Sequence, residues 1–193
     1  MVISGPSGVG KDAVIEALKR RPGRWDAHYV VTYTTRVRRT GETDALSYHF
    51  VDDERFSAMR FAGQLLEASE VHGHWYGTPR DQVVEALTTG RDVVLKIDVQ
   101  GARIVRRRVP QAVLIFIVPP SPEDLTARLR ARATESDDEL ALRQRDALVE
   151  LARQGDYDYS VVNETGQVDR TAARVDEIIE AEHRSRPDRR VAV

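Results

Sequence analysis

The sequence predicts an α/β fold in which a five-stranded parallel sheet is flanked by helices. Short runs rich in β-branched residues alternate along the chain with segments whose apolar residues recur at helical spacing. This alternation is typical of parallel strands joined by helices. In addition, the first apolar run leads directly through a glycine-rich turn into a helical segment that ends near Arg20.

Five apolar runs are expected to form the strands. They are Val2–Ser4, Tyr29–Thr32, Val93–Ile97, Val113–Val118 and Tyr159–Val162. The expected helices are Asp12–Arg20, Pro79–Thr88, Ala102–Arg107, Pro122–Ala131, Asp137–Arg153 and Thr171–Ser185. Two helix starts carry capping signals, one at Ser121-Pro122 and one at Ser136 with Glu139 three residues later.

The stretch from Thr34 to Trp75 interrupts the strand and helix rhythm. It carries turn residues at Thr40-Gly41 and Asp52-Asp53 and alternating residues in Ser47–Val51. We interpret it as an inserted, partly β subdomain. A chain of 193 residues, 41% hydrophobic, suits one compact domain with such an insertion.

Composition excludes several classes of protein. The 29 Lys and Arg residues nearly balance 31 Asp and Glu, which gives no support for a dedicated nucleic-acid or membrane binder. The absence of cysteine excludes disulfides, thiolate zinc sites and thiol nucleophiles. The longest apolar run, Ala112–Pro120, is well short of the about 20 residues that span a bilayer. Because the first residues lack the pattern of a signal peptide, a cytoplasmic protein is expected.

The strongest motif lies between the first expected strand and the first expected helix. It reads Gly5-Pro6-Ser7-Gly8-Val9-Gly10-Lys11. Glycines allow backbone amides to surround phosphate oxygens, the helix N-terminus adds partial positive charge, and Lys11 can reach the phosphates. The motif therefore predicts a phosphate-binding loop.

Asp12 stands where such loops usually carry a Ser or Thr hydroxyl that ligates magnesium. Two interpretations remain open. In the first, the carboxylate is simply favoured in the first turn by the helix dipole. Alternatively, it replaces the hydroxyl beside Mg²⁺, a hard cation that prefers oxygen ligands.

A second cluster identifies a family. It reads Thr32-Tyr33-Thr34-Thr35-Arg36-Val37-Arg38-Arg39-Thr40-Gly41-Glu42, followed by Tyr48. Here the sequence resembles the guanylate kinase family, whose GMP-binding subdomain opens with Thr-Thr-Arg, a second arginine three residues on, and Gly-Glu. The likeness continues in order through Leu66-Glu67, Trp75-Tyr76-Gly77-Thr78, Ile97-Asp98-Val99-Gln100-Gly101, Pro119-Pro120-Ser121 and Val162-Asn163.

The resemblance implies a P-loop kinase fold with an inserted GMP-binding subdomain and a helical lid. The implied core is 1–31, 90–121 and 155–193, the GMP-binding subdomain is 32–89, and the lid is 122–154. The implied activity is transfer of the γ-phosphoryl group of ATP to GMP, which gives ADP and GDP, with Mg²⁺ as cofactor. ATP and GMP are the expected partners of a monomer or homodimer, with no nucleic acid and no membrane.

The hydrogen-bonding edge of guanine supports the implied pocket. Guanine presents donors at N1 and N2 and an acceptor at O6, so a selective pocket needs carboxylates and a donor. Glu67 and Asp98 suit the first task, and Thr32 and Thr78 suit the second. Adenine would leave a buried carboxylate unpaired, which costs on the order of a few kcal/mol. The residues expected to bind the GMP phosphate are Arg36, Arg39, Tyr48 and Tyr76.

The expected chemistry needs no general base, because the acceptor is already an anionic phosphate that requires alignment and charge neutralisation. The expected catalytic residues are Lys11, Arg36, Arg39, Arg128, Arg132 and Arg143. The expected ATP-binding residues are Gly5, Pro6, Ser7, Gly8, Val9, Gly10, Lys11, Asp12, Arg132 and Asn163. Many relatives carry an acidic residue at the position of Lys96, so a charge exchange with Asp12, the candidate Mg²⁺ ligand, is a hypothesis.

Three alternatives remain. A ribose 1,5-bisphosphate phosphokinase has a similar Lys-Asp loop, but its substrate would not require Glu67, Asp98 or the GMP-phosphate set. A non-catalytic guanylate-kinase-like module that binds phosphopeptides would not require intact Gly10-Lys11 and lid arginines. A general P-loop ATPase differs in that its ATP turnover would not depend on GMP.

Overall fold

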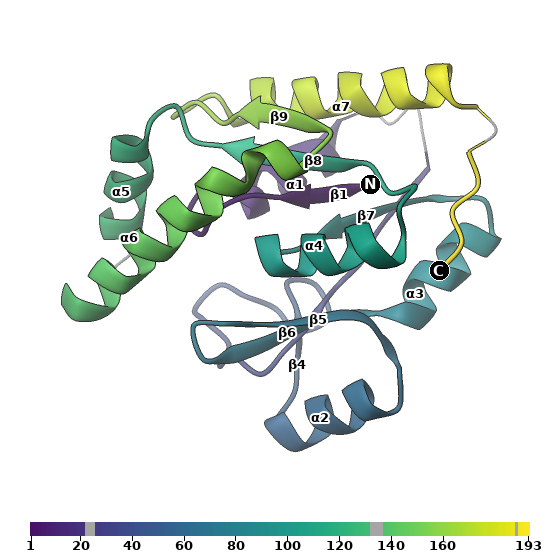
Figure 1. The fold of residues 1–193 in the computed structure, drawn as a ribbon, viewed down its shortest axis with the longest axis horizontal. Coiled ribbons are helices and arrows are strands. Elements are labelled where there is room, and N and C mark those ends of the chain that lie inside the picture. Colours follow the sequence, from purple (N-terminus) through teal and green to yellow (C-terminus); the bar gives the residue numbers. More distant parts are fainter. Residues whose placement is uncertain (22–25, 132–136, 188) are drawn as a thin grey trace. The chain divides into compact units, whose positions relative to one another are not determined.

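The chain forms two units, each with its own buried strands. The computed structural model describes residues 1–21, 26–131, 137–187 and 189–193. The first unit comprises Met1–Arg24, Lys96–Val99 and Val113–Arg190, and the second comprises Trp25–Leu95, Gln100–Ala112 and Val191–Val193. A five-stranded sheet has the order β2-β7-β1-β8-β9, and a separate four-stranded sheet has the order β4-β3-β6-β5 (Figure 1).

The first unit contains three parallel strands, and its apolar core forms around the central one, β8. They are β1 (Val2–Ser4), β8 (Leu114–Val118) and β9 (Tyr159–Val162), with β8 paired to both neighbours. Every residue of β1 and β8 is buried, as expected for strands covered on both faces. The helices are α1 (Lys11–Arg20), α5 (Pro122–Ala131), α6 (Asp137–Leu151) and α7 (Val168–Ser185), with a 3₁₀ turn at Ala152–Asp156. Helix α7 packs along α1.

The second unit contains the small sheet. Its strands are β3 (Tyr33–Thr34), β4 (His49–Phe50), β5 (Leu65–Val71) and β6 (His74–Pro79), and β5 pairs with β6 in an antiparallel hairpin. Strand β2 (Ala27–Tyr29) pairs in parallel with β7 (Asp92–Lys96). The helices are α2 (Asp53–Phe61), α3 (Arg80–Thr88) and α4 (Val99–Arg108).

Most strand and helix predictions are confirmed, with errors at the ends of elements. The bounds predicted for β1, β9 and α5 agree with the structure. Strand β2 ends at Tyr29, so the predicted strand Tyr29–Thr32 was placed too late; only the amide of Val30 still bonds to a β7 carbonyl, that of Val94, at 3.1 Å. Helices α4 and α7 each begin three residues before their predicted starts. The capping residue predicted at Ser136 lies outside the described residues.

Helix α2 was missed by the sequence prediction. Asp52, interpreted as a turn residue, is its N-cap, and the Asp52 carboxylate accepts a hydrogen bond of 2.7 Å from the amide of Arg55. Only Phe56 of this helix is buried, so its apolar pattern is too sparse to reveal helical spacing. The Phe56 ring stacks on Trp75 of β6 at a centroid distance of 5.8 Å and fixes α2 to the small sheet.

None of the helices within the described ranges is long and apolar enough to cross a membrane.

We predict that Phe56→Ala destabilises the second unit by about 3–5 kcal/mol, because the substitution opens a cavity beside Trp75. Phe61→Ala is the matched control from the same helix, since the Phe61 side chain is 87% exposed and its loss should change stability by at most about 0.5 kcal/mol. Urea unfolding followed by tryptophan fluorescence measures both variants. Equal stability of the two variants would contradict the assignment of Phe56 to the core.

Candidate active site

The phosphate loop connects β1 to α1 and has a backbone that only glycine permits. Gly10 has φ of 97°, and a Cβ atom there would lie 2.7 Å from Nδ2 of Asn163. At Gly5 a Cβ atom would lie 2.4 Å from the carbonyl oxygen of Ile117. The Lys11 ammonium donates to the carbonyl oxygens of Gly5 at 2.6 Å and Pro6 at 3.1 Å, so it lies within the loop.

Two predicted site residues hold the loop through one carbonyl group, that of Val9. Nδ2 of Asn163 donates to it at 2.8 Å, and Nη1 of Arg128 donates to it at 3.2 Å. Arg128 also donates to the carbonyl of Asn163 at 2.7 Å, and the Thr171 hydroxyl donates to Oδ1 of Asn163 at 3.0 Å. The end of β9, α5 and α7 therefore fix the conformation of the loop.

Helix α6 contacts the loop at Ser7 through two side chains of opposite charge. The amide of Ser7 donates to Oε2 of Glu150 at 2.9 Å, and Nη2 of Arg143 donates to the Ser7 hydroxyl at 3.4 Å. Arg143 was a sequence prediction, whereas Glu150 was missed, because an acidic residue on an amphipathic helix carries no signal of its own. The remaining predicted arginine of this region, Arg132, lies outside the described residues.

Acidic groups surround the loop lysine. Burial lowers the pKa of the Lys11 ammonium, whereas Glu150, Asp12 and Asp98 favour its charged form and oppose this shift. Burial raises the pKa of the Glu150 carboxyl, and the Ser7 amide and Lys11 act in the opposite direction. Asp98, predicted as a guanine ligand, is thus part of the electrostatic environment of the phosphate loop in the first unit.

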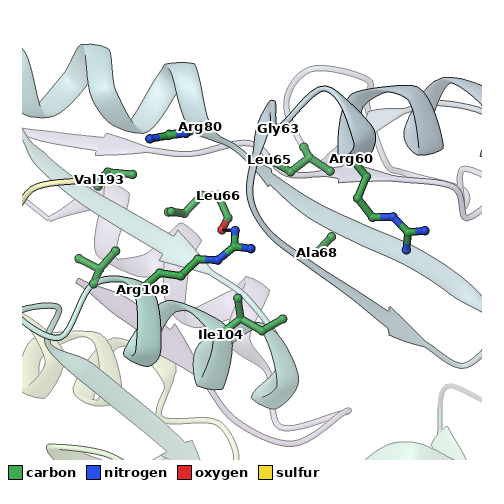
Figure 2. Close-up of a pocket in the computed structure, with 10 residues that line it drawn as sticks. Arg60, Gly63, Leu65, Leu66, Ala68, Arg80, Ile104, Arg108 and Val193 are labelled. Atoms are coloured by element: carbon green, nitrogen blue, oxygen red, sulfur yellow. Dashed lines mark hydrogen bonds between the residues drawn. The ribbon is translucent and has the colours of Figure 1, made fainter.

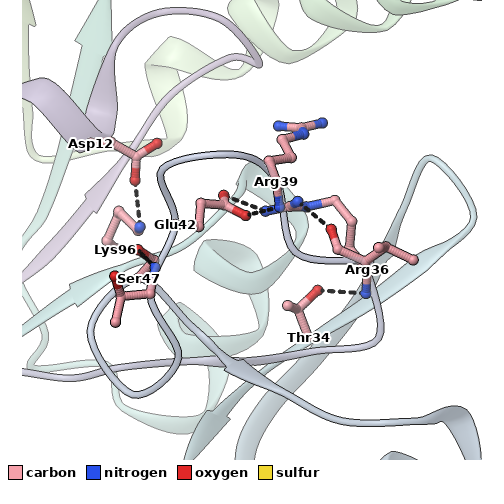
Figure 3. A network of polar contacts seen from close by, with 9 residues as sticks. Asp12, Thr34, Arg36, Arg39, Glu42, Ser47 and Lys96 are labelled. Carbon is pink, nitrogen blue, oxygen red and sulfur yellow. Dashed lines mark hydrogen bonds and ion pairs between the residues drawn. The ribbon is translucent and has the colours of Figure 1, made fainter.

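Asp12 and Lys96 form an ion pair of 2.5 Å (Figure 3). The Asp12 side chain is 66% exposed and that of Lys96 is 19% exposed, so the carboxylate remains accessible on its solvent side. Among the residues that the structure describes, no three His, Cys, Asp or Glu side chains are grouped to hold a metal ion. One accessible carboxylate nevertheless fits Mg²⁺, which protein sites commonly bind through one or two carboxylates together with substrate phosphates.

In the second unit, Glu67 and Thr78 form a buried polar pair. They are register partners on β5 and β6, and the Thr78 hydroxyl donates to Oε1 of Glu67 at 2.6 Å. Glu67 is 2% exposed and Thr78 is fully buried. Thr32, the other predicted donor to guanine, is also buried.

A basic and aromatic cluster in the same unit contains the predicted GMP-phosphate residues. Arg36 is 7% exposed, lies over the Tyr48 ring at 5.5 Å, and donates to Oε1 of Glu42 at 2.6 Å (Figure 3). The Tyr48 and Tyr76 rings meet edge to face at 5.9 Å. The backbone amide of Arg39 donates to Oε2 of Glu42 at 2.8 Å, whereas the Arg39 residue is exposed.

Glu42 therefore orders both arginine positions, although the sequence analysis assigned it no role. Burial alone would raise its pKa, but the hydrogen bonds from Arg36 and from the Arg39 amide lower the pKa of the Glu42 carboxyl below its ordinary value. The charged carboxylate keeps the Arg36 guanidinium in one orientation.

A cavity of about 560 Å³ lies elsewhere in the second unit (Figure 2). Its walls include Leu66 and Ala68 of β5, and Arg108 donates a hydrogen bond to the carbonyl of Leu66. Ala68 follows Glu67 in the regularly paired part of β5, and successive strand residues face opposite sides of a sheet, so the Ala68 side chain points away from the side that carries Glu67. None of the predicted site residues lines this cavity.

The strand, glycine-rich turn, lysine and helix of the first unit have the arrangement of the phosphate-binding element of P-loop phosphotransferases. With arginines from α5 and α6 bound to that loop, fold and site define a P-loop kinase.

Comparisons with known proteins give the family. A family model for guanylate kinase matches residues 1–182. A guanylate kinase of Thermobifida fusca (strain YX) is 46% identical over 162 residues, which is 84% of this chain and 82% of that protein. One from Streptococcus agalactiae serotype III (strain NEM316) is 46% identical over 184 residues, or 95% of this chain and 86% of that protein. A crystal structure of guanylate kinase from Anaplasma phagocytophilum, 33% identical, covers 94% of this chain and 84% of its own with a TM-score of 0.74. The chain belongs to the guanylate kinase family.

Proposed function

We propose that this chain transfers the γ-phosphoryl group of ATP to GMP, with the phosphate loop of the first unit holding the donor and the small-sheet side of the second unit holding the acceptor. The observation that carries the choice of acceptor is the buried pair of Glu67 and Thr78. This pair would present a carboxylate and a hydroxyl to the hydrogen-bonding edge of the guanine base. Family membership supports the same activity.

Guanine would be selected by hydrogen bonding. In the proposed complex, Glu67 accepts from the N1 and N2 donors, Asp98 is a second acceptor, and Thr32 and Thr78 serve O6. The Thr78 hydroxyl can donate only one hydrogen, so donation to O6 requires it to leave Glu67 Oε1 as the guanine donors replace it. Adenine offers an acceptor at N1, which would face the Glu67 carboxylate where guanine presents a donor, and two acceptors cannot form a hydrogen bond.

The GMP phosphate would bind the cluster of Arg36, Arg39, Tyr48 and Tyr76. Arg36 is already oriented by Glu42, so little side-chain freedom is lost on binding. The exposed Arg39 can supply the second cation. Two guanidinium groups suit a phosphate dianion, because each can donate two parallel hydrogen bonds.

In the proposed reaction, a GMP phosphate oxygen attacks the γ-phosphorus of ATP, and the bond from that phosphorus to the β,γ-bridging oxygen breaks. ADP leaves with the electron pair of the broken bond, and no proton has to be removed from the attacking oxygen. Lys11 and Arg143, with Arg36, Arg39, Arg128 and Arg132, would neutralise the spread negative charge. Arg128 also holds the loop through Val9. Mg²⁺, when bound beside Asp12, would supply further charge compensation on the phosphates.

We propose that the chain is divided as expected from the sequence. The core is 1–31, 90–121 and 155–193, the GMP-binding subdomain is 32–89, and the lid is 122–154. A lid that excludes water would prevent transfer of the phosphoryl group to water. We further propose a cytoplasmic monomer or homodimer. The sugar kinase and the phosphopeptide module are not favoured, since the curated relatives described above are guanylate kinases.

The assay that tests the function offers ATP and Mg²⁺ with GMP, AMP, UMP or ribose 1,5-bisphosphate and couples ADP release to NADH oxidation. We expect turnover with GMP to exceed turnover with AMP by at least about a thousandfold in kcat/KM, because the site is built to bind hydrogen-bond donors. Equal ADP release with and without GMP would instead identify a general ATPase.

We predict that Glu42→Ala raises the KM for GMP about tenfold and changes kcat less, since one charge-assisted hydrogen bond that orients Arg36 is lost. Steady-state kinetics with varied GMP at saturating ATP measure the effect. Glu85→Gln is the control, because Glu85 is an exposed acidic residue of α3 in the same unit. An unchanged KM for GMP would remove Glu42 from the acceptor site.

We predict that Asp12→Ala raises the Mg²⁺ concentration needed for half-maximal rate roughly tenfold, because the carboxylate near the metal is lost and alanine has no oxygen that could replace it. A magnesium titration at fixed ATP and GMP measures this. Glu16→Gln controls for the loss of one negative charge from α1, where Glu16 pairs with Lys19 at 2.9 Å. An unchanged magnesium dependence and rate would reject a metal role for Asp12.

A further inference from the structure

Helix α6 places an anion in the loop that must receive an anionic phosphate chain. The Glu150 carboxylate accepts a hydrogen bond of 2.9 Å from the Ser7 amide and also favours the charged form of Lys11. Backbone amides and a lysine are the groups by which such a loop binds phosphate oxygens. Glu150 thus occupies one of the groups that phosphate would use, the Ser7 amide.

The contact is built into the face of the helix. Glu150 follows Arg143 by seven residues, about two helical turns, so the two side chains lie on one face of α6. Ala147 between them is 1% exposed, which shows that this face is packed inside the first unit. Arg143 and Glu150 meet the loop at the same residue, Ser7. The arginine attracts a donor phosphate, whereas the glutamate competes with it.

Competition follows from hydrogen-bond capacity and charge. The Ser7 amide has one hydrogen and cannot form a full hydrogen bond with a carboxylate and a phosphate at the same time. In addition, a carboxylate beside a phosphate oxygen is repelled most strongly where water is scarce. Binding of a phosphate chain in the loop therefore requires the Glu150 carboxylate to give up its hydrogen bond with the Ser7 amide.

We propose that Glu150 is an internal anion of the donor site, which fills the phosphate loop before ATP binds and is displaced by the phosphates of ATP. The residue sets donor affinity and keeps the Ser7 amide paired in the nucleotide-free enzyme. This inference rests on the proposed assignment of the loop to ATP. It makes Glu150 a positioning residue of the loop and gives it no role in contacting the transferred group.

The test measures dissociation constants of ATP and of inorganic tripolyphosphate by calorimetry without GMP, at one fixed Mg²⁺ concentration, for the full chain. Glu150→Ala should bind both ligands about three- to tenfold more tightly, since the competing charge and acceptor are gone. Glu150→Gln should show a smaller gain, because its amide oxygen still accepts from Ser7 without charge. The nucleotide-free Tm of Glu150→Ala should fall, so affinity and stability change in opposite directions.

Asp146→Asn is the matched control, since it removes one negative charge from α6 one turn before Glu150. Its donor affinity should stay within about twofold of the unmodified chain, because hydrogen-bond competition at Ser7 is unaffected. An equal gain in Asp146→Asn, or unchanged or weaker binding in both Glu150 variants, overturns the proposal. If Glu150→Ala does not fold, Glu150→Gln decides alone.

GMP turnover by the unmodified chain separates this inference from the proposed function. An active enzyme whose donor affinity does not respond to Glu150 contradicts the internal anion only. A chain that never phosphorylates GMP contradicts the proposed function itself.

Discussion

The carbonyl group of Val9 is the point on which the shape of the phosphate loop depends. The phosphate loop has few side chains of its own, so its shape must be imposed from outside. Asn163 and Arg128 both donate to this carbonyl, and Thr171 in turn orients Asn163. These contacts tie a short, glycine-rich turn to the apolar centre of the first unit. Residues that resemble nucleotide ligands in the sequence thus also serve as the scaffold of the loop.

The small sheet and its loops in the second unit follow a different rule, because they bury the charged side chains of Glu67 and Arg36. A buried carboxylate or guanidinium is tolerated only when partners satisfy it, and removing one partner is costly. Thr78 donates a hydrogen bond to Glu67, and Glu42 accepts one from Arg36. These partners keep the polar groups oriented before any ligand arrives. Preorganisation of this kind lowers the entropy that binding must overcome, and it explains why the small sheet carries so many polar residues in buried positions.

Parallel strands were predictable because burial on both faces leaves a continuous apolar run, as in β8, and a proline at the first helical turn marked α5. The chemistry of the site was predictable from residue types in a recognisable order. What the sequence could not supply were contacts set by tertiary structure. Helix α2 buries a single aromatic residue, and Glu150 sits on an ordinary amphipathic helix, so neither stands out before folding. The roles of the individual site residues remain predictions.

The ion pair of Asp12 and Lys96 connects two departures from the usual pattern of the family, a carboxylate in place of a hydroxyl and a lysine in place of an acidic residue. A carboxylate in place of a neutral hydroxyl would add a negative charge close to the phosphates, which is unfavourable in a partly buried site. Lys96 lies 2.5 Å away and cancels that charge, so the pair itself is neutral. Replacing the neutral hydroxyl by Asp12 alone would make the local charge one unit more negative, whereas replacing an acidic residue by Lys96 alone would make it two units more positive. Their pairing gives a physical reason for Asp12 and Lys96 to occur together in one chain.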